Sequence, residues 1–191
     1  MRIVGGKWKG HPIEAPDGRD VTRPTTDRVR EAVSSMLLSA RGLSLDDVRA
    51  LDAFAGSGAL GLELLSRGAA HVTFVDLDRG ACARVRRNAG TLGAAPATFA
   101  VVRGDSCRLA AAGSLAGAPF DIVLLDPPYA TEVDVVAGLV EALDCSGLLA
   151  SDAIVLYERS ASRPTIEPAG FVPLKQKRYG QTAVDLLGRE S

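Results

Sequence analysis

Cysteine is scarce in this sequence, and long apolar runs are missing from it. The cysteines, Cys82, Cys107 and Cys145, are widely spaced and form no CxxC pair, so neither a disulfide framework nor a zinc site is favoured. No stretch of about 18 uninterrupted apolar residues occurs, so no membrane span is expected. The N-terminus also lacks the apolar run of a signal peptide. We therefore expect a reduced, soluble protein of the cytoplasm that binds no metal and no membrane.

The sequence has almost no net charge. It contains 22 Lys and Arg against 23 Asp and Glu, a formal net charge of -1, which excludes a strongly basic protein. The charges are unevenly spread, however. Residues 1–30 carry seven basic and four acidic side chains, residues 157–191 carry six and four, and residues 31–156 carry nine and fifteen. The basic ends leave local contact with a polyanion open.

Internal repeats and low-complexity tracts are also absent. The composition, 47% hydrophobic and 24% charged, is typical of globular proteins and excludes wholesale disorder. A chain of 191 residues suits one domain, with or without a small appendage, and is large enough to be stable as a monomer without a disulfide or metal.

Apolar runs alternate with helical patterns along the chain, which predicts an α/β fold with a mostly parallel, seven-stranded sheet. The last two strands are close in sequence, so we expect them to form an antiparallel hairpin. The predicted helices cover residues 25–40, 59–67, a segment that ends near 92, and 132–143. The predicted strands cover residues 49–53, 71–75, 98–102, 120–125, 153–158, 171–177 and 182–187.

Residues 1–24 differ from the rest, because short β-like pieces are broken there by several glycines and prolines. They predict a small β-hairpin extension at the N-terminus, and residues 25–191 form the main domain.

A glycine-rich loop follows the first predicted strand. Residues 51–61 read LDAFAGSGALG and place a GxGxxG pattern between a strand and a helix. Glycine lets a ligand approach the backbone closely, and free amides at the helix start can bond it. Asp76 ends the next strand, where a carboxylate would bond the ribose of an adenosine-containing cofactor. The loop residues predicted to bind the cofactor are Asp52, Phe54, Ala55, Gly56, Ser57 and Gly58.

Two cofactors fit such a loop, a nicotinamide dinucleotide and S-adenosylmethionine. Asp52 separates them, because an acid near the helix start repels a pyrophosphate but attracts a sulfonium and an amino group. The pattern therefore favours S-adenosylmethionine. Asp105 and Ser106 follow the third strand and are further cofactor candidates. There Asp105 would bond the adenine amino group, or cap a helix.

The second motif is Asp-Pro-Pro-Tyr at residues 126–129, directly after an apolar strand. Two consecutive prolines make a stiff turn, and the carboxyl edge of an open α/β sheet is where ligands bind. The Asp126 carboxylate and the Pro127 carbonyl can each accept a hydrogen bond from one –NH2 group, and Tyr129 can stack on a planar ring. We interpret these three residues as the catalytic site for a base with an exocyclic amine, with Asp126 also facing the cofactor.

With both motifs identified, the sequence resembles the class I S-adenosylmethionine-dependent methyltransferases, and specifically the RsmD family. The resemblance covers nearly the whole chain, including RIVGGKWKG at residues 2–10, RPTTDRVRE at 23–31 and FAGSGALG at 54–61. It implies methylation of a guanine N2 in bacterial 16S ribosomal RNA within a small-subunit particle. The family usually has a glutamate where this chain has Asp76, and often a phenylalanine where it has Tyr129.

Basic and aromatic side chains near the two ends are candidates for contact with RNA. The alternative for each of them is that the side chain is merely exposed to solvent or packs against the domain. The candidate substrate-binding residues, besides Tyr129, are Lys7, Trp8, Lys9, Arg23, Arg28, Arg30, Lys177 and Arg178.

Other functions remain open from the sequence. Adenine presents a similar amine, so adenine-N6 methylation of RNA or DNA is the main alternative. A nicotinamide-dependent oxidoreductase and a non-catalytic RNA-binding protein are further ones, and the two motifs argue against both.

Overall fold

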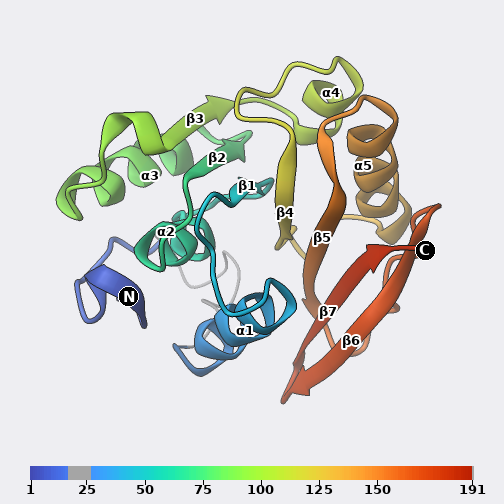
Figure 1. Ribbon diagram of the computed structural model, residues 1–191, viewed down its shortest axis with the longest axis horizontal. Helices are drawn as coiled ribbons and strands as arrows, with labels where there is room; N and C mark the ends of the chain where they lie inside the picture. Colours follow the sequence, from blue (N-terminus) through green and yellow to red (C-terminus); the bar gives the residue numbers. More distant parts are fainter. Residues whose placement is uncertain (17–26, 191) are drawn as a thin grey trace.

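Seven strands form one sheet in the order β3-β2-β1-β4-β5-β7-β6 (Figure 1). The computed structural model describes residues 1–16 and 27–190. The first five strands in this order run parallel, and β7 pairs antiparallel with both β5 and β6. This arrangement confirms the predicted sheet and its terminal hairpin. The strands are β1 (Arg49–Asp52), β2 (His71–Asp76), β3 (Phe99–Arg103), β4 (Phe120–Leu125), β5 (Leu149–Ser160), β6 (Phe171–Tyr179) and β7 (Thr182–Arg189).

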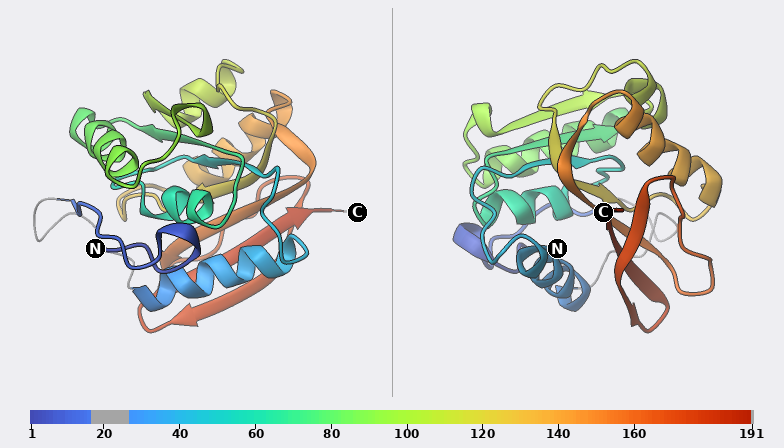
Figure 2. Two further views of the ribbon diagram at one scale, coloured as in Figure 1. Left: turned by 60° about the vertical axis from the view of Figure 1, so that its left-hand side comes forward. Right: turned by 45° about the vertical axis from the view of Figure 1, so that its right-hand side comes forward.

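Helices cover both faces of the sheet and give three layers (Figures 1 and 2). One apolar core joins α1, α2 and α3 to one face, and a second joins α4 and α5 to the other. From Ile122 to Leu125 of β4 the side chains alternate between the two cores, as a strand buried on both faces requires. The helices are α1 (Asp27–Ala40), α2 (Ala59–Ser66), α3 (Arg79–Thr91), α4 (Ser106–Ala111) and α5 (Val133–Cys145), with short 3-10 turns at Gly6–Trp8 and Pro96–Thr98.

From β1 the chain adds β2 and β3 on one side of the sheet and then β4 and β5 on the other side. In an open α/β sheet such a switch point opens a crevice at the carboxyl ends of the strands. The glycine loop follows β1 and the Asp-Pro-Pro-Tyr turn follows β4, so both predicted motifs reach this crevice.

The N-terminal segment is less regular than the predicted hairpin. Its two arms are antiparallel and joined by three backbone hydrogen bonds, with one isolated bridge between Arg2 and Pro12 and a 3-10 turn between the arms. The segment also binds to α2: the Val4 N–H donates to the Glu63 carboxylate, and the Trp8 N–H donates to the Ser66 hydroxyl. These bonds add to the pairing of the arms and hold the segment on α2.

Within the described residues, no helix is both long and apolar enough to cross a membrane. The same part of the chain contains no group of three or more His, Cys, Asp or Glu side chains that could hold a metal ion.

Candidate active site

The glycine loop turns sharply from β1 into α2. Gly56 and Gly58 have φ values of 55° and 78°, in the left-handed region that favours glycine. The Gly58 N–H donates to the Ala55 carbonyl at 2.6 Å, which closes the turn directly before the helix. The loop backbone is thereby held at the carboxyl edge of the sheet, where a ligand can approach it.

Gly61, the third glycine of the pattern, allows α2 to lie close against the sheet. A Cβ at this position would lie 2.4 Å from Cε1 of Phe74 and 2.9 Å from Cγ1 of Val72, both in β2. Its N–H donates to Oδ2 of Asp52 at 3.1 Å. Gly61 therefore serves helix–sheet packing and the orientation of Asp52.

Asp52 ends β1 and is 2% exposed. Burial, opposed by the hydrogen bond from Gly61 and reinforced by the nearby Asp76 carboxylate, raises the pKa of Asp52 to about 7. Asp76 ends β2, and its two carboxylate oxygens accept the N–H groups of Gly56 and Asp78, each at 2.8 Å. Asp76 thus ties the glycine loop to the start of α3. Each of its oxygens keeps a lone pair for a ligand hydroxyl.

Asp105 caps α4, because its carboxylate accepts the N–H groups of Cys107 and Arg108. The capping role weighed from the sequence is therefore confirmed. The Ser106 hydroxyl donates to the Ala53 carbonyl at 2.5 Å and is turned away from a ligand. Both residues nonetheless line the same cavity as the glycine loop.

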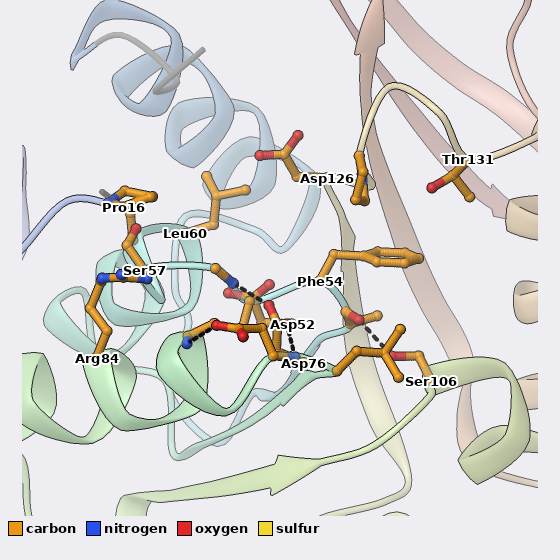
Figure 3. Close-up of a pocket in the computed structure, with 18 of the residues that line it drawn as sticks. Pro16, Asp52, Phe54, Ser57, Leu60, Asp76, Arg84, Ser106, Asp126 and Thr131 are labelled. Carbon is orange, nitrogen blue, oxygen red and sulfur yellow. Dashed lines mark hydrogen bonds between the residues drawn. The ribbon is translucent and has the colours of Figure 1, made fainter. Parts of the chain in front are cut away.

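That cavity has a volume of about 700 Å³ and lies between the glycine loop, the starts of α3 and α4, and the turn after β4 (Figure 3). It brings together nearly all the predicted cofactor-binding residues. Gly58 does not line it; the N–H of this glycine donates to the Ala55 carbonyl inside the turn. The predicted residues that line it are Asp52, Phe54, Ala55, Gly56, Ser57, Asp76, Asp105, Ser106 and Asp126.

Asp126 stands across the cavity from the glycine loop, at the end of β4 (Figure 3). Burial, followed by the Glu158 and Asp52 carboxylates, raises the pKa of Asp126 well above its ordinary value. Glu158 is not among the site residues predicted from the sequence. It follows Tyr157, which pairs with Leu125, so the parallel register puts Glu158 beside Asp126. The signal for it in the sequence is the parallel pairing of the predicted strands 120–125 and 153–158.

Tyr129 and Pro127 do not line this cavity, whereas Pro128 and Thr131 do. The Tyr129 side chain is 49% exposed and faces a second, neighbouring cavity. The tyrosine ring therefore lies at the outer side of the Asp-Pro-Pro-Tyr turn, which corrects the expectation that it closes the same pocket as Asp126.

Comparison with known proteins shows what this architecture is similar to. A family model described as conserved hypothetical protein 95 matches residues 1–188. Ribosomal RNA small subunit methyltransferase D of Escherichia coli is 37% identical over 100% of this chain and 91% of its own length. The chain belongs to the RsmD family. The protein of the same name from Haemophilus influenzae is 32% identical over 94% of this chain and 89% of its own length.

Solved structures agree with the placement in the RsmD family. The yhhF protein of Escherichia coli superposes with a TM-score of 0.82 at 36% identity, over 100% of this chain and 98% of that one. The HI0767 protein of Haemophilus influenzae gives a TM-score of 0.77 at 27% identity, over 100% of this chain and 99% of that one. The class I methyltransferase fold expected from the sequence is thereby confirmed.

In this RsmD-family chain, the N-terminal candidates for RNA contact separate by burial. Trp8 is 8% exposed and packs into the core with α2, so its ring is not available to stack on a base. Lys7 and Lys9 are exposed, and Lys7 Nζ lies 4.5 Å from the centre of the Trp8 ring. The tryptophan is thus a packing residue with cations beside it, which corrects its predicted role.

The candidate arginines near α1 also differ in position. Arg28 is exposed, whereas Arg30 is 1% exposed and donates to the Arg2 carbonyl and the Asp27 carboxylate. Arg30 lines the main cavity, so a surface phosphate cannot reach it. Arg23 lies outside the described residues. Arg84 on α3 has an 11% exposed side chain and also lines the cavity.

Lys177 and Arg178 are exposed on β6, the edge strand of the sheet. The Arg178 Nε donates to the Gly180 carbonyl, in the turn before β7. Both cations therefore lie on the surface near the second cavity, which Gln181 of the same turn lines.

Proposed function

We propose that this protein transfers a methyl group from S-adenosylmethionine to the exocyclic N2 amine of a guanine in 16S ribosomal RNA. The observation that carries the proposal is one cavity with the glycine loop on one side and the half-buried Asp126 of Asp-Pro-Pro-Tyr on the other. The relatives named ribosomal RNA small subunit methyltransferase D indicate the RNA.

The residues of the cavity fit S-adenosylmethionine by the chemistry of their groups. A Cβ at Gly56 would meet no atom within 4 Å, so the loop presents open backbone there. Asp76 suits the ribose hydroxyls, and the free oxygen of Asp105 suits the adenine amine. Asp52 is a buried carboxylate with a raised pKa, and a cationic ligand would stabilise its ionised form. When bound, S-adenosylmethionine supplies the methyl group on a sulfonium.

Asp126 and Pro127 act on the amine. An exocyclic amine is a weak nucleophile because its lone pair is delocalised into the ring. Asp126 and Pro128 line the cavity, and the Pro127 carbonyl belongs to the peptide bond between Pro127 and Pro128. The Asp126 carboxylate and this carbonyl accept the protons of the amine, and this favours a tetrahedral nitrogen with a directed lone pair. The methylated nitrogen must lose a proton, and the Asp126 carboxylate beside it can accept this proton. The protein also speeds the reaction by holding the amine nitrogen in line with the methyl group on the sulfonium.

The setting of the reaction completes the proposal. The substrate is 16S ribosomal RNA within a small-subunit particle, and exposed cations such as Lys7, Lys9, Arg28, Lys177 and Arg178 contact its phosphates. The protein acts as a monomer in the cytoplasm and uses no metal.

The test is methyl transfer from labelled donor to small subunits and to deproteinised RNA, both from cells that lack this gene. We expect labelled N2-methylguanine. Labelled N6-methyladenine would overturn the choice of base, and tight binding of NAD without binding of S-adenosylmethionine would overturn the enzyme class.

Variants of two aspartates test the site itself. Asp126→Asn should abolish turnover and keep the dissociation constant for S-adenosylmethionine within a few-fold. Asp47→Asn is the matched control: Asp47 is exposed with φ 64°, a conformation that asparagine also tolerates. Near-wild-type turnover by Asp126→Asn would contradict the mechanism.

A further inference from the structure

A second cavity of about 440 Å³ adjoins the candidate active site. It is lined by Tyr129 of the Asp-Pro-Pro-Tyr turn, by Ser160, Ser162 and Arg163 at the end of β5 and after it, and by Gln181 between β6 and β7. Arg163 connects the two cavities, because its Nη1 donates to the Thr131 carbonyl at 2.7 Å and Thr131 lines the first cavity. The two cavities therefore share the loop that follows β4.

A buried ion pair fixes the position of Arg163. The Arg159 Nε donates to Oδ2 of Asp185 at 2.6 Å, and Asp185 is 0% exposed. The Arg159 Nη1 also donates to the Arg163 carbonyl. The charge of Arg159 is thus neutralised within the sheet, and its role is to hold the backbone of the loop that carries Arg163.

Arg163 itself keeps its charge for a ligand. Among residues 1–16 and 27–190, no carboxylate forms an ion pair with its guanidinium. One of its five N–H donors is used on Thr131, which leaves the others for an anion. The Ser160 and Ser162 hydroxyls bond each other at 2.8 Å, which leaves one hydroxyl proton, and this proton and the Gln181 amide add neutral donors around it. Such a set of donors around one cation fits a phosphate group, to which arginine binds with particular strength.

The half-exposed Tyr129 ring is the aromatic wall of the same cavity. A base can stack on this ring while its backbone phosphate lies against the donors, as in sites that bind unpaired RNA. Arg178 lies beside the β6–β7 turn, on the same face of the sheet as Arg159, and adds an exposed cation there. A free phosphate or a protein ligand would not need the aromatic wall, so an RNA strand fits best.

We infer, as a deepening of the proposed function, that this second cavity binds a backbone phosphate of the RNA next to the methylated nucleotide, with Arg163 as its cation. The cavity thereby places the strand so that the neighbouring base reaches Asp126. Arg163 acts as a binding and positioning residue and takes no part in the methyl transfer.

The test compares Arg163→Gln with wild type in methylation of small-subunit RNA over a range of salt concentrations. One phosphate contact to a single strand contributes about 0.7 to the slope of log affinity against log salt. We expect the slope to fall by about 0.7 and RNA affinity, measured as KM, to weaken about fivefold at about 0.1 M salt. The kcat at saturating RNA and the affinity for S-adenosylmethionine should stay near wild type. Arg163→Lys should restore the slope, because the charge returns.

Arg86→Gln is the matched control. Like Arg163, Arg86 donates from Nη2 to a backbone carbonyl, that of Val101, but on the distant helix α3. It should leave the slope and KM unchanged. The inference is overturned if Arg163→Gln keeps the wild-type slope, or if it lowers kcat alone, which would reduce Arg163 to a support for the Thr131 loop. If wild type methylates no guanine in this RNA, the proposed function fails before the variants are compared.

Discussion

Replacement of Gly61 by alanine tests whether close packing of α2 on the sheet builds the cofactor cavity. The added Cβ would lie 2.4 Å from Cε1 of Phe74 and 2.9 Å from Cγ1 of Val72. Both neighbours are fully buried in the core of the sheet, so neither can move aside without disturbing other side chains. The helix must therefore shift away from β2, and the glycine loop at its start must shift with it.

The magnitude follows from a matched pair of variants. Gly138 also lies inside a helix, α5, but a Cβ there would meet no atom within 4 Å. Both Gly→Ala changes gain about 0.8–1 kcal/mol from helix propensity. Only Gly61→Ala also incurs the overpacking cost of about 1–3 kcal/mol. The difference between the two variants isolates that cost, and for a chain of this size about 2 kcal/mol corresponds to a Tm difference of about 4–8 °C.

Thermal unfolding of both variants and titration with S-adenosylmethionine measure the effect. Gly138→Ala should raise the Tm and leave ligand affinity unchanged. Gly61→Ala should unfold at a lower temperature than Gly138→Ala and bind S-adenosylmethionine more weakly, because the N–H that orients Asp52 moves with the helix. Equal Tm and equal affinity in the two variants would refute the role assigned to this glycine.

Three further predictions concern charge, packing and RNA contact. Because the pKa of Asp52 is about 7 and a cationic donor favours its ionised form, affinity for S-adenosylmethionine should rise about tenfold from pH 6 to pH 8. Calorimetry should show a smaller pH dependence in Asp52→Asn, and an undiminished one would contradict the assignment. Trp8→Ala should cost about 3–5 kcal/mol of stability in denaturant unfolding, because Trp8 is buried. Lys7→Ala and Lys9→Ala should change stability by less than about 0.5 kcal/mol but weaken RNA binding, and an unchanged RNA affinity would assign these lysines to the solvated surface.

The glycine loop and the Asp-Pro-Pro-Tyr turn could be predicted because their chemistry is local. Each motif lies within about ten residues and directly follows an apolar strand, so the rule that parallel strands end at one edge brings them together. The structure lines one cavity with Asp52, Asp76 and Asp126, three residues that the sequence placed at the ends of three strands. The spacing of the motifs and the order of the predicted strands were sufficient to predict that these three aspartates share one site.

Burial of individual side chains could not be predicted in the same way, because distant residues decide it. Trp8 stands between two lysines and suggests an exposed aromatic ring, yet Ser66, 58 residues away, bonds its N–H and holds it against α2. The second cavity likewise combines Tyr129, Arg163 and Gln181, which come from three separate connections. No local pattern marks such a set, since the pairing of β4 with β5 and of β5 and β6 with β7 brings it together.

The buried carboxylate of Asp52 in the main cavity lowers the free energy of unfolding of the ligand-free protein. The pKa of Asp52 is raised from 3.8 to about 7, so its ionisation costs the folded state about 4 kcal/mol relative to the unfolded chain. The sign follows from proton binding: between these two values the folded protein keeps a proton that the unfolded chain has lost. Stability from this group therefore falls as the pH rises from about 4 to about 7 and is level above that. A bound cation would offset part of this cost, so ligand binding should raise the Tm more at and above neutral pH than at pH 5 through this group.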